Sequence, residues 1–104
     1  MDKKLYVLNV ISLRTSDFAE AGCEHLVKAE VVSFKEETEA YKKAVLKKIA
    51  AKYVGAHAKD EEFEQEFSTF EGKLMLESTW DYGYQGYELY GFCVELGPCE
   101  VKEL

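Results

Sequence analysis

The chain has 104 residues, close to the usual size of one domain, and 47% of them are apolar while 32% are charged. This balance is typical of a globular protein with one hydrophobic core and excludes a disordered chain. No stretch approaches the roughly 20 apolar residues that a membrane-spanning helix needs. We therefore expect a single domain over residues 1–104, with a loose tail from residue 100 onward.

The net charge of −7 is unevenly distributed along the chain. Residues 1–35 are neutral and residues 36–59 carry +3, whereas residues 60–104 carry −10, from twelve acids against Lys73 and Lys102. A negative field over the second half disfavours nucleic acid and anionic membranes as direct partners. It favours a protein partner with a basic surface.

The first third of the chain predicts two strands. Residues 5–13 are apolar on both alternating faces, which is typical of a largely buried strand. Residues 25–34 alternate apolar with charged side chains, which indicates a half-buried strand.

Two helices are expected in the middle of the chain. Residues 38–54 carry apolar side chains at four-residue intervals from Tyr41 to Tyr53, with lysines on the remaining face. Residues 61–70 follow Asp60, which is a good N-cap, and their acids surround an aromatic stripe. The members of that stripe stand at helical spacing: Phe63, Phe67 and Phe70. If these helices are neighbours, the acids of the second neutralise the lysines of the first, which weighs against phosphate binding by the lysines.

The last third of the chain predicts two more strands, at residues 74–80 and 87–96, joined by a turn with two glycines. The element order is then ββααββ. Short connections favour an α+β fold in which a four-stranded antiparallel sheet carries two helices packed on one face. This pattern leaves the order of the strands open.

Three cysteines, Cys23, Cys93 and Cys99, are present. An odd number, without the pattern of an export signal near the N-terminus, predicts free thiols and a cytoplasmic protein. With His25 they offer four groups that bind zinc, but the spacings Cys-x-His and Cys-x5-Cys are not those of the usual zinc sites. We expect no metal or other cofactor.

Motifs of the common enzyme classes are not found in the sequence. It contains no phosphate-binding loop, dinucleotide fingerprint, HExxH or EF-hand loop. Asp81 and Glu88 offer an acid–base pair, although two solvated turn acids are the simpler interpretation. We therefore expect a protein that is not an enzyme.

Aromatic residues are concentrated between residues 80 and 92, mixed with acids. Tryptophan and tyrosine are enriched at interfaces because each combines a large apolar body with a polar tip. Tyr90 and Phe92 share a face that we assign to the core, whereas Tyr82 and Tyr84 fall in the turn, where a core can hardly use them. The predicted partner-binding residues are Trp80, Asp81, Tyr82, Tyr84, Tyr87, Glu88, Glu62 and Glu66.

Charge and aromatic content together favour a small acidic protein-binding module, an inhibitor or nucleic-acid mimic that blocks a basic surface of its partner. Small antagonists carried by phages and mobile elements, such as anti-CRISPR proteins, offer an analogy in size and charge. The alternative is a small metal-binding domain or enzyme built on the cysteines and histidines. A third hypothesis is a homodimer that buries the free face of the sheet.

Overall fold

The structure is a computed structural model and describes residues 3–16, 23–81 and 88–100. The predicted loose tail and the turn after residue 81 lie largely outside these ranges. Five strands, one α-helix and a short 3-10 helix (η1) occur in the described residues. In chain order they are β1 (Tyr6–Ser16), β2 (Cys23–Val32), α1 (Glu39–Val54), η1 (Gly55–Lys59), β3 (Glu64–Phe70), β4 (Lys73–Asp81) and β5 (Glu88–Pro98).

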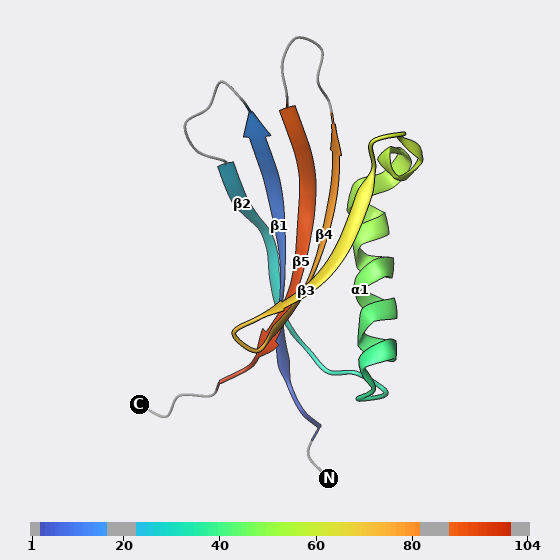
Figure 1. Ribbon diagram of the computed structural model, residues 1–104. Helices are drawn as coiled ribbons and strands as arrows, with labels where there is room; N and C mark the ends of the chain where they lie inside the picture. The colour runs from blue at the N-terminus through green and yellow to red at the C-terminus, as the bar shows by residue number, and fades with distance from the viewer. Residues whose placement is uncertain (1–2, 17–22, 82–87, 101–104) are drawn as a thin grey trace.

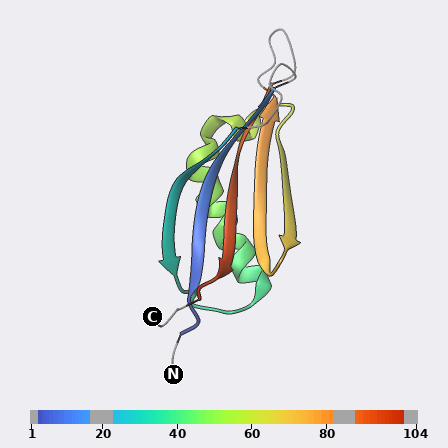
Figure 2. The ribbon, with the colours of Figure 1, turned by 90° about the vertical axis from the view of Figure 1, so that its left-hand side faces the viewer.

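The strands form one antiparallel sheet in the order β2-β1-β5-β4-β3 (Figure 2). The predicted four-stranded sheet with two helices is therefore wrong, because the described part of the chain has five strands and one α-helix. The first and last strands pair along their whole length, from Tyr6 opposite Pro98 to Ser16 opposite Glu88. This long-range pairing places β1 and β5 in the interior of the sheet and leaves β2 and β3 at its edges.

The second predicted helix, over residues 61–70, is instead the strand β3. It pairs with β4 through a two-residue loop, Glu71 and Gly72, whose φ angles are 51° and 78°. Positive φ at both positions is the mark of a type I′ turn, which suits the twist of a hairpin. Gly72, interpreted from the sequence as a helix stop, is thus a hairpin residue, and the tight hairpin overrides the helical spacing of the phenylalanines.

The first predicted helix is confirmed as α1. The Thr38 hydroxyl accepts a hydrogen bond from the Tyr41 amide at 3.2 Å, which is an N-cap, and Gly55 ends the helix with a φ of 58°. The innermost residues are Leu46, Ala50 and Val54. The predicted stripe from Tyr41 to Tyr53 lies beside them and is half-buried.

The core lies between α1 and one face of the sheet. Its buried members are Tyr6, Leu8, Phe34, Leu46, Ala50, Leu76, Val94 and Leu96. Leu46 and Leu76 are fully buried, and burying such a side chain stabilises the fold by roughly 1.5–3 kcal/mol. Helix α1 packs over β5 and β4, and no described element covers the opposite face of the sheet (Figure 1).

One irregularity bends the edge strand β2. Val10 pairs with Lys28, but Ile11 pairs with Leu26, so Val27 is an extra residue in the ladder. Such a β-bulge increases the local twist of an edge strand. On either side of it the side chains alternate regularly, which assigns each residue of β2 to the helix-covered face or to the uncovered one.

Candidate protein-binding surface

The uncovered side of the sheet, called here the open face, is a surface that no other element of the described chain packs against (Figure 2). Strand alternation and register define its residues, because directly paired residues share a face. Its apolar members are Val7, Ile11, Leu13, Leu26, Ala29, Val31, Phe70 and Met75. Its acidic members are Glu24, Glu64, Glu66, Glu77 and Glu95.

The apolar and acidic residues are segregated across the open face. The apolar side chains lie mainly on β1 and β2, where Leu26 and Val31 are 63% and 59% exposed. The acids gather on β3 and β4, where Glu64, Glu66 and Glu77 are exposed. The β1–β2 side of the face is therefore mainly apolar, and the β3–β4 side carries most of the acids together with one base, Lys73, whose amine lies 3.5 Å from Glu95.

Glu66 and Glu77 are direct cross-strand partners in the β3–β4 hairpin. Like charges opposite one another destabilise a sheet by a few tenths of a kcal/mol to about 1 kcal/mol. The ion pairs found between described residues do not include either glutamate. The repulsion is therefore not balanced by a paired cation in the described part of the chain.

Strand geometry also decides which charges meet the lysines of α1. Alternation turns Phe67 toward the helix, where the amines of Lys43 and Lys47 lie 5.3 and 5.8 Å from the centre of its ring. The flanking Glu64 and Glu66 point to the open face instead. The expected neutralisation of the lysines therefore fails for Glu64 and Glu66, because the sheet stands between them and α1.

Cys93 lies at the centre of the open face, and the pKa of its thiol is affected by the negative charges there. It pairs with Ile11 and Glu77 and is 5% exposed. Burial, and then the negative charges of Glu77, Glu95 and Glu24, raise the pKa of its thiol from the ordinary value of 9.0 to about 12. Three glutamates from three different strands thus act on one point of this face.

The structure places the predicted partner-binding residues in different environments. Glu62 and Glu66 are exposed, the first in the turn before β3 and the second on the open face. Trp80 is 6% exposed and belongs to the interior. Tyr82, Tyr84 and Tyr87 lie outside the described residues.

Two further acids flank the undescribed turn. Asp81 ends β4 and Glu88 begins β5, where their backbones pair with Leu89 and Ser16. β4 thus ends, and β5 begins, at the same end of the sheet (Figure 1).

Trp80 packs under the end of the helical layer. The His57 imidazole stacks on its indole, with ring centroids 4.3 Å apart and planes 5° from parallel, and Phe92 lies at 6.1 Å. The His57 ring is held in turn by Asp60, whose carboxylate lies 2.9 Å from Nδ1. The indole Nε1 is buried and has no hydrogen-bond partner among the described residues. The ring of Trp80 is therefore covered and is not itself available for contact with a partner. It can only stabilise the residues that pack over it.

The four groups considered for zinc are spread along the sheet. The backbone of Cys23 pairs with Arg14 at one end of β1, whereas the amide of Cys99 donates to the Leu5 carbonyl at the other end. His25 pairs with Ser12 on the helix side, while Cys93 belongs to the open face. Among the described residues no group of three or more His, Cys, Asp or Glu side chains is placed to hold a metal ion. Cys93 and Cys99 are free thiols.

Sequence reasoning missed the exposed apolar residues of the open face. Phe70 is 64% exposed, because three residues after Phe67 a strand has reversed its face. The signal was available in the alternation of acids with Phe67 over residues 64–68, which fits a period of two as well as the helical period. Leu26 and Val31 were assigned to a half-buried strand, but no layer formed by the described residues covers them.

Comparison of the chain with protein-family models, with curated proteins and with solved structures finds no match. In the described part of the chain, no helix has the length and apolar content required to cross a membrane. The functional interpretation consequently depends on the geometry of the surface itself.

Proposed function

We propose that the protein is a small, acidic, non-enzymatic module that binds another protein and blocks a basic surface on it. The observation that carries the proposal is the opposition of Glu66 and Glu77 on the open face. This arrangement costs free energy in the isolated sheet. Lysine or arginine side chains of a partner would convert the cost into a favourable contact on binding.

The spacing of the acids suits an extended basic groove. A β-strand rises about 3.4 Å per residue, which matches the rise per nucleotide along one DNA strand. Glutamates at alternate residues, such as Glu64 and Glu66, therefore reach about half the charge density of one strand. Glu77 adds a second row on the neighbouring strand, about 4.8 Å away. This supports a target whose basic surface ordinarily binds nucleic acid.

The tyrosines of the turn complete the proposed surface. Tyr82, Tyr84 and Tyr87 follow β4 directly in the sequence. In the proposal the acids accelerate encounter and the aromatic rings slow dissociation, because desolvated aromatic anchors dominate the energetics of interfaces. Tyr82→Ala and Tyr84→Ala are expected to weaken binding by about 1–3 kcal/mol each.

The test begins with identification of the partner. The wild-type protein and the Glu64→Gln/Glu66→Gln variant are used to capture proteins from a lysate of the native host, with mass spectrometry as the readout. The Glu36→Gln/Glu100→Gln variant removes the same charge at exposed positions that are not on the open face. The partner should be captured by the wild type and the control, and much less by the Glu64/Glu66 variant.

Binding kinetics with the purified partner then separate the two contributions. The Glu64/Glu66 variant should associate more slowly, and its association rate should depend less on salt, because screening acts on the charges that it has lost. If the Glu64/Glu66 variant associates as fast as the wild type, and with the same salt dependence, the acidic surface is refuted as the binding site.

Competition distinguishes a blocker of nucleic-acid binding from a general acidic binder. If the target surface is a nucleic-acid channel, a short duplex or single strand should displace the protein from its partner. A partner that binds the protein and nucleic acid simultaneously would refute the nucleic-acid-mimic form of the proposal, and a partner without a basic surface would refute both forms.

A further inference from the structure

Strand β2 leaves one backbone edge unpaired over ten residues. It hydrogen-bonds to β1 on its inner side, and none of the described residues pairs with its outer side. An edge of this length is a template for another strand, and natural proteins usually protect it with charges, proline or a covering segment. From Leu26 to Val32 the charged residues of β2 are Lys28 and Glu30 alone.

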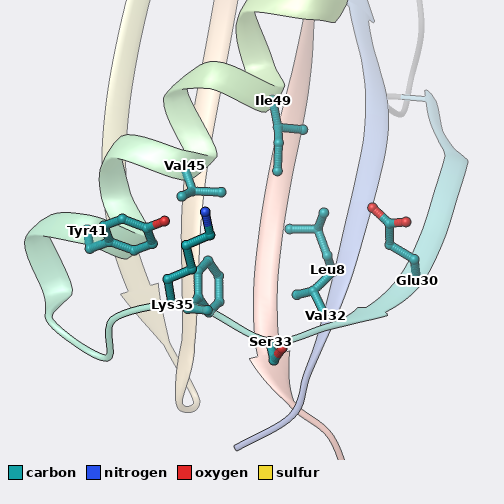
Figure 3. Close-up of a pocket in the computed structure, with 9 residues that line it drawn as sticks. Leu8, Glu30, Val32, Ser33, Lys35, Tyr41, Val45 and Ile49 are labelled. Carbon is teal, nitrogen blue, oxygen red and sulfur yellow. The ribbon is translucent and has the colours of Figure 1, made fainter. Parts of the chain in front are cut away.

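Several side chains along this edge are apolar although they are exposed to water. Leu26, Val27 and Val31 are 63%, 49% and 59% exposed. On the other side of β2, Leu8 and Val32 face Tyr41, Val45 and Ile49 of α1 across a groove of about 260 Å³ (Figure 3). Glu30 lies at the rim of that groove (Figure 3). Both sides of the edge thus expose apolar surface.

The opposite edge of the sheet also exposes an apolar side chain, Phe70, but it is acidic. β3 is seven residues long and exposes Glu64 and Glu66. Pairing β3 with a copy of itself would bring additional glutamates together, at a cost in free energy. Of the two edges, β2 is therefore the one that suits a second copy of this chain.

The charges of β2 are complementary to themselves. Lys28 and Glu30 lie on the same side of the strand, with Nζ and Oε2 3.6 Å apart, and their side chains are 52% and 42% exposed. In an antiparallel pair of identical strands, a two-fold axis at Ala29 sets Lys28 opposite Glu30 of the second copy, and Glu30 opposite its Lys28. The same register sets Val31 opposite Val27.

The neighbouring registers bring less favourable contacts between the charged side chains. An axis at Lys28 or at Glu30 places a charge opposite its own copy, which is repulsive. An axis at Val31 sets Lys28 opposite Phe34, which lies beyond the end of the strand. The charge pattern thus selects one register among those that the edge permits.

We infer that β2 pairs with β2 of a second copy about a two-fold axis at Ala29, which joins the two sheets into one of ten strands. The aliphatic stem of Lys28 then covers the apolar groove of the other copy beside Glu30. The acidic β3 edges stand at the two ends of the joined sheet, roughly 40 Å apart at the usual strand spacing. At that distance salt screens their repulsion. The bulge at Val27 keeps the paired segment short. The dimer is therefore in equilibrium with the monomer and dissociates on dilution.

The test uses charge reversal in both directions. Lys28→Glu alone sets glutamate opposite glutamate at two symmetric places, and Glu30→Lys alone sets lysine opposite lysine. Each variant should raise the dissociation constant of the dimer at least about tenfold, because symmetry doubles the effect. An equimolar mixture of the two variants restores both complementary pairs and should form a heterodimer, measured by sedimentation velocity over a concentration series.

Three comparisons make the result decisive. The double variant Lys28→Glu/Glu30→Lys should dimerise like the wild type, and Lys48→Glu, an exposed change on α1, should leave dimerisation unaltered. Circular dichroism verifies that the single variants are folded. A wild type that stays monomeric up to its solubility limit, single variants that still dimerise, or a mixture that does not associate would each overturn the inference. None of these outcomes bears on the proposed acidic surface at β3 and β4.

Discussion

Glu66 and Glu77 face each other across β3 and β4, and both side chains are exposed on the side of the sheet away from α1. A directly opposed pair of like charges is unfavourable in the free protein. Glu66→Gln keeps the size of the side chain and removes the repulsion. We expect it to raise the free energy of unfolding by about 0.2–1 kcal/mol at low ionic strength, measured by urea denaturation.

The salt dependence and a control identify the cause of that gain. The difference between Glu66→Gln and the wild type should shrink as salt is added, because an exposed repulsion is screened. Glu36→Gln, at an exposed position outside the sheet, should give a smaller change. A loss of stability in Glu66→Gln would mean that its carboxylate has a favourable partner.

Substitutions at Phe67 and Phe70 distinguish the strand β3 from the helix predicted at residues 61–70. In β3, Phe67 packs against the core, whereas Phe70 is 64% exposed on the open face. Phe67→Ala should lower the free energy of unfolding by about 1–3 kcal/mol, less than the 3–5 kcal/mol of a fully buried phenylalanine. Phe70→Ala should change it by less than about 0.5 kcal/mol. Equal losses for both would fit the helical stripe and contradict β3.

The sequence predicted local structure well where one period dominated. The helix over residues 38–54 has caps at both ends and a continuous apolar stripe, and it is observed as α1. Residues 61–70 satisfied two periods at once, since Phe63 and Phe67, at helical spacing, also alternate with the acids Glu62, Glu64 and Glu66. The deciding feature was the two-residue turn at Glu71 and Gly72, whose meaning depends on the strand that follows it.

The candidate surface was less predictable because it depends on long-range pairing. That Glu64 and Glu66 lie away from the lysines follows from the face of the sheet that α1 covers, which no local pattern specifies. β1 is apolar on both sides, typical of a strand covered on both faces, yet its Val7 and Ile11 side belongs to the open face. Trp80 was predicted to bind a partner from composition alone, and the stack with His57 depends on how η1 packs over the sheet.

Gly91 occupies a position on β5 that has no room for a side chain. A Cβ there would overlap the Ser78 carbonyl oxygen and would lie 2.9 Å from Cγ2 of Thr79. The first contact is with backbone in the middle of the sheet and cannot relax cheaply. Gly91→Ala should therefore lower the free energy of unfolding by about 2 kcal/mol or more, as overpacking does.

Gly97, on the same strand, provides the matched control for this prediction. The atoms nearest to a Cβ there belong to the flexible side chain of Lys73, with Cγ at 3.3 Å. Gly97→Ala should cost less than about 1 kcal/mol, measured by the same urea denaturation. Similar losses for the two variants would show that the general cost of altering β5, rather than the close approach at Ser78, determines the result.

Cys93 should be far less reactive than an exposed thiol, because alkylation requires the thiolate. Its pKa of about 12, raised from 9.0 first by burial and then by Glu77, Glu95 and Glu24, leaves about a thousandfold less thiolate at pH 8.5. Iodoacetamide at that pH should label Cys93 on the timescale of unfolding, with Cys99 as the half-buried reference in the same chain. Peptide mass spectrometry measures both rates.

The same pKa shift determines how Cys93 affects stability in alkali. The unfolded chain loses this proton near pH 9 and the folded chain near pH 12, so the folded state binds more protons between those values. The contribution is fully present below pH 9 and decreases as the pH rises toward 12. Cys93→Ala should flatten this decrease relative to the wild type.

Glu77→Gln should speed alkylation of Cys93 only modestly, because burial is the larger cause of the raised pKa and remains. Labelling of folded Cys93 as fast as that of Cys99 would contradict both its burial and the negative field of the open face.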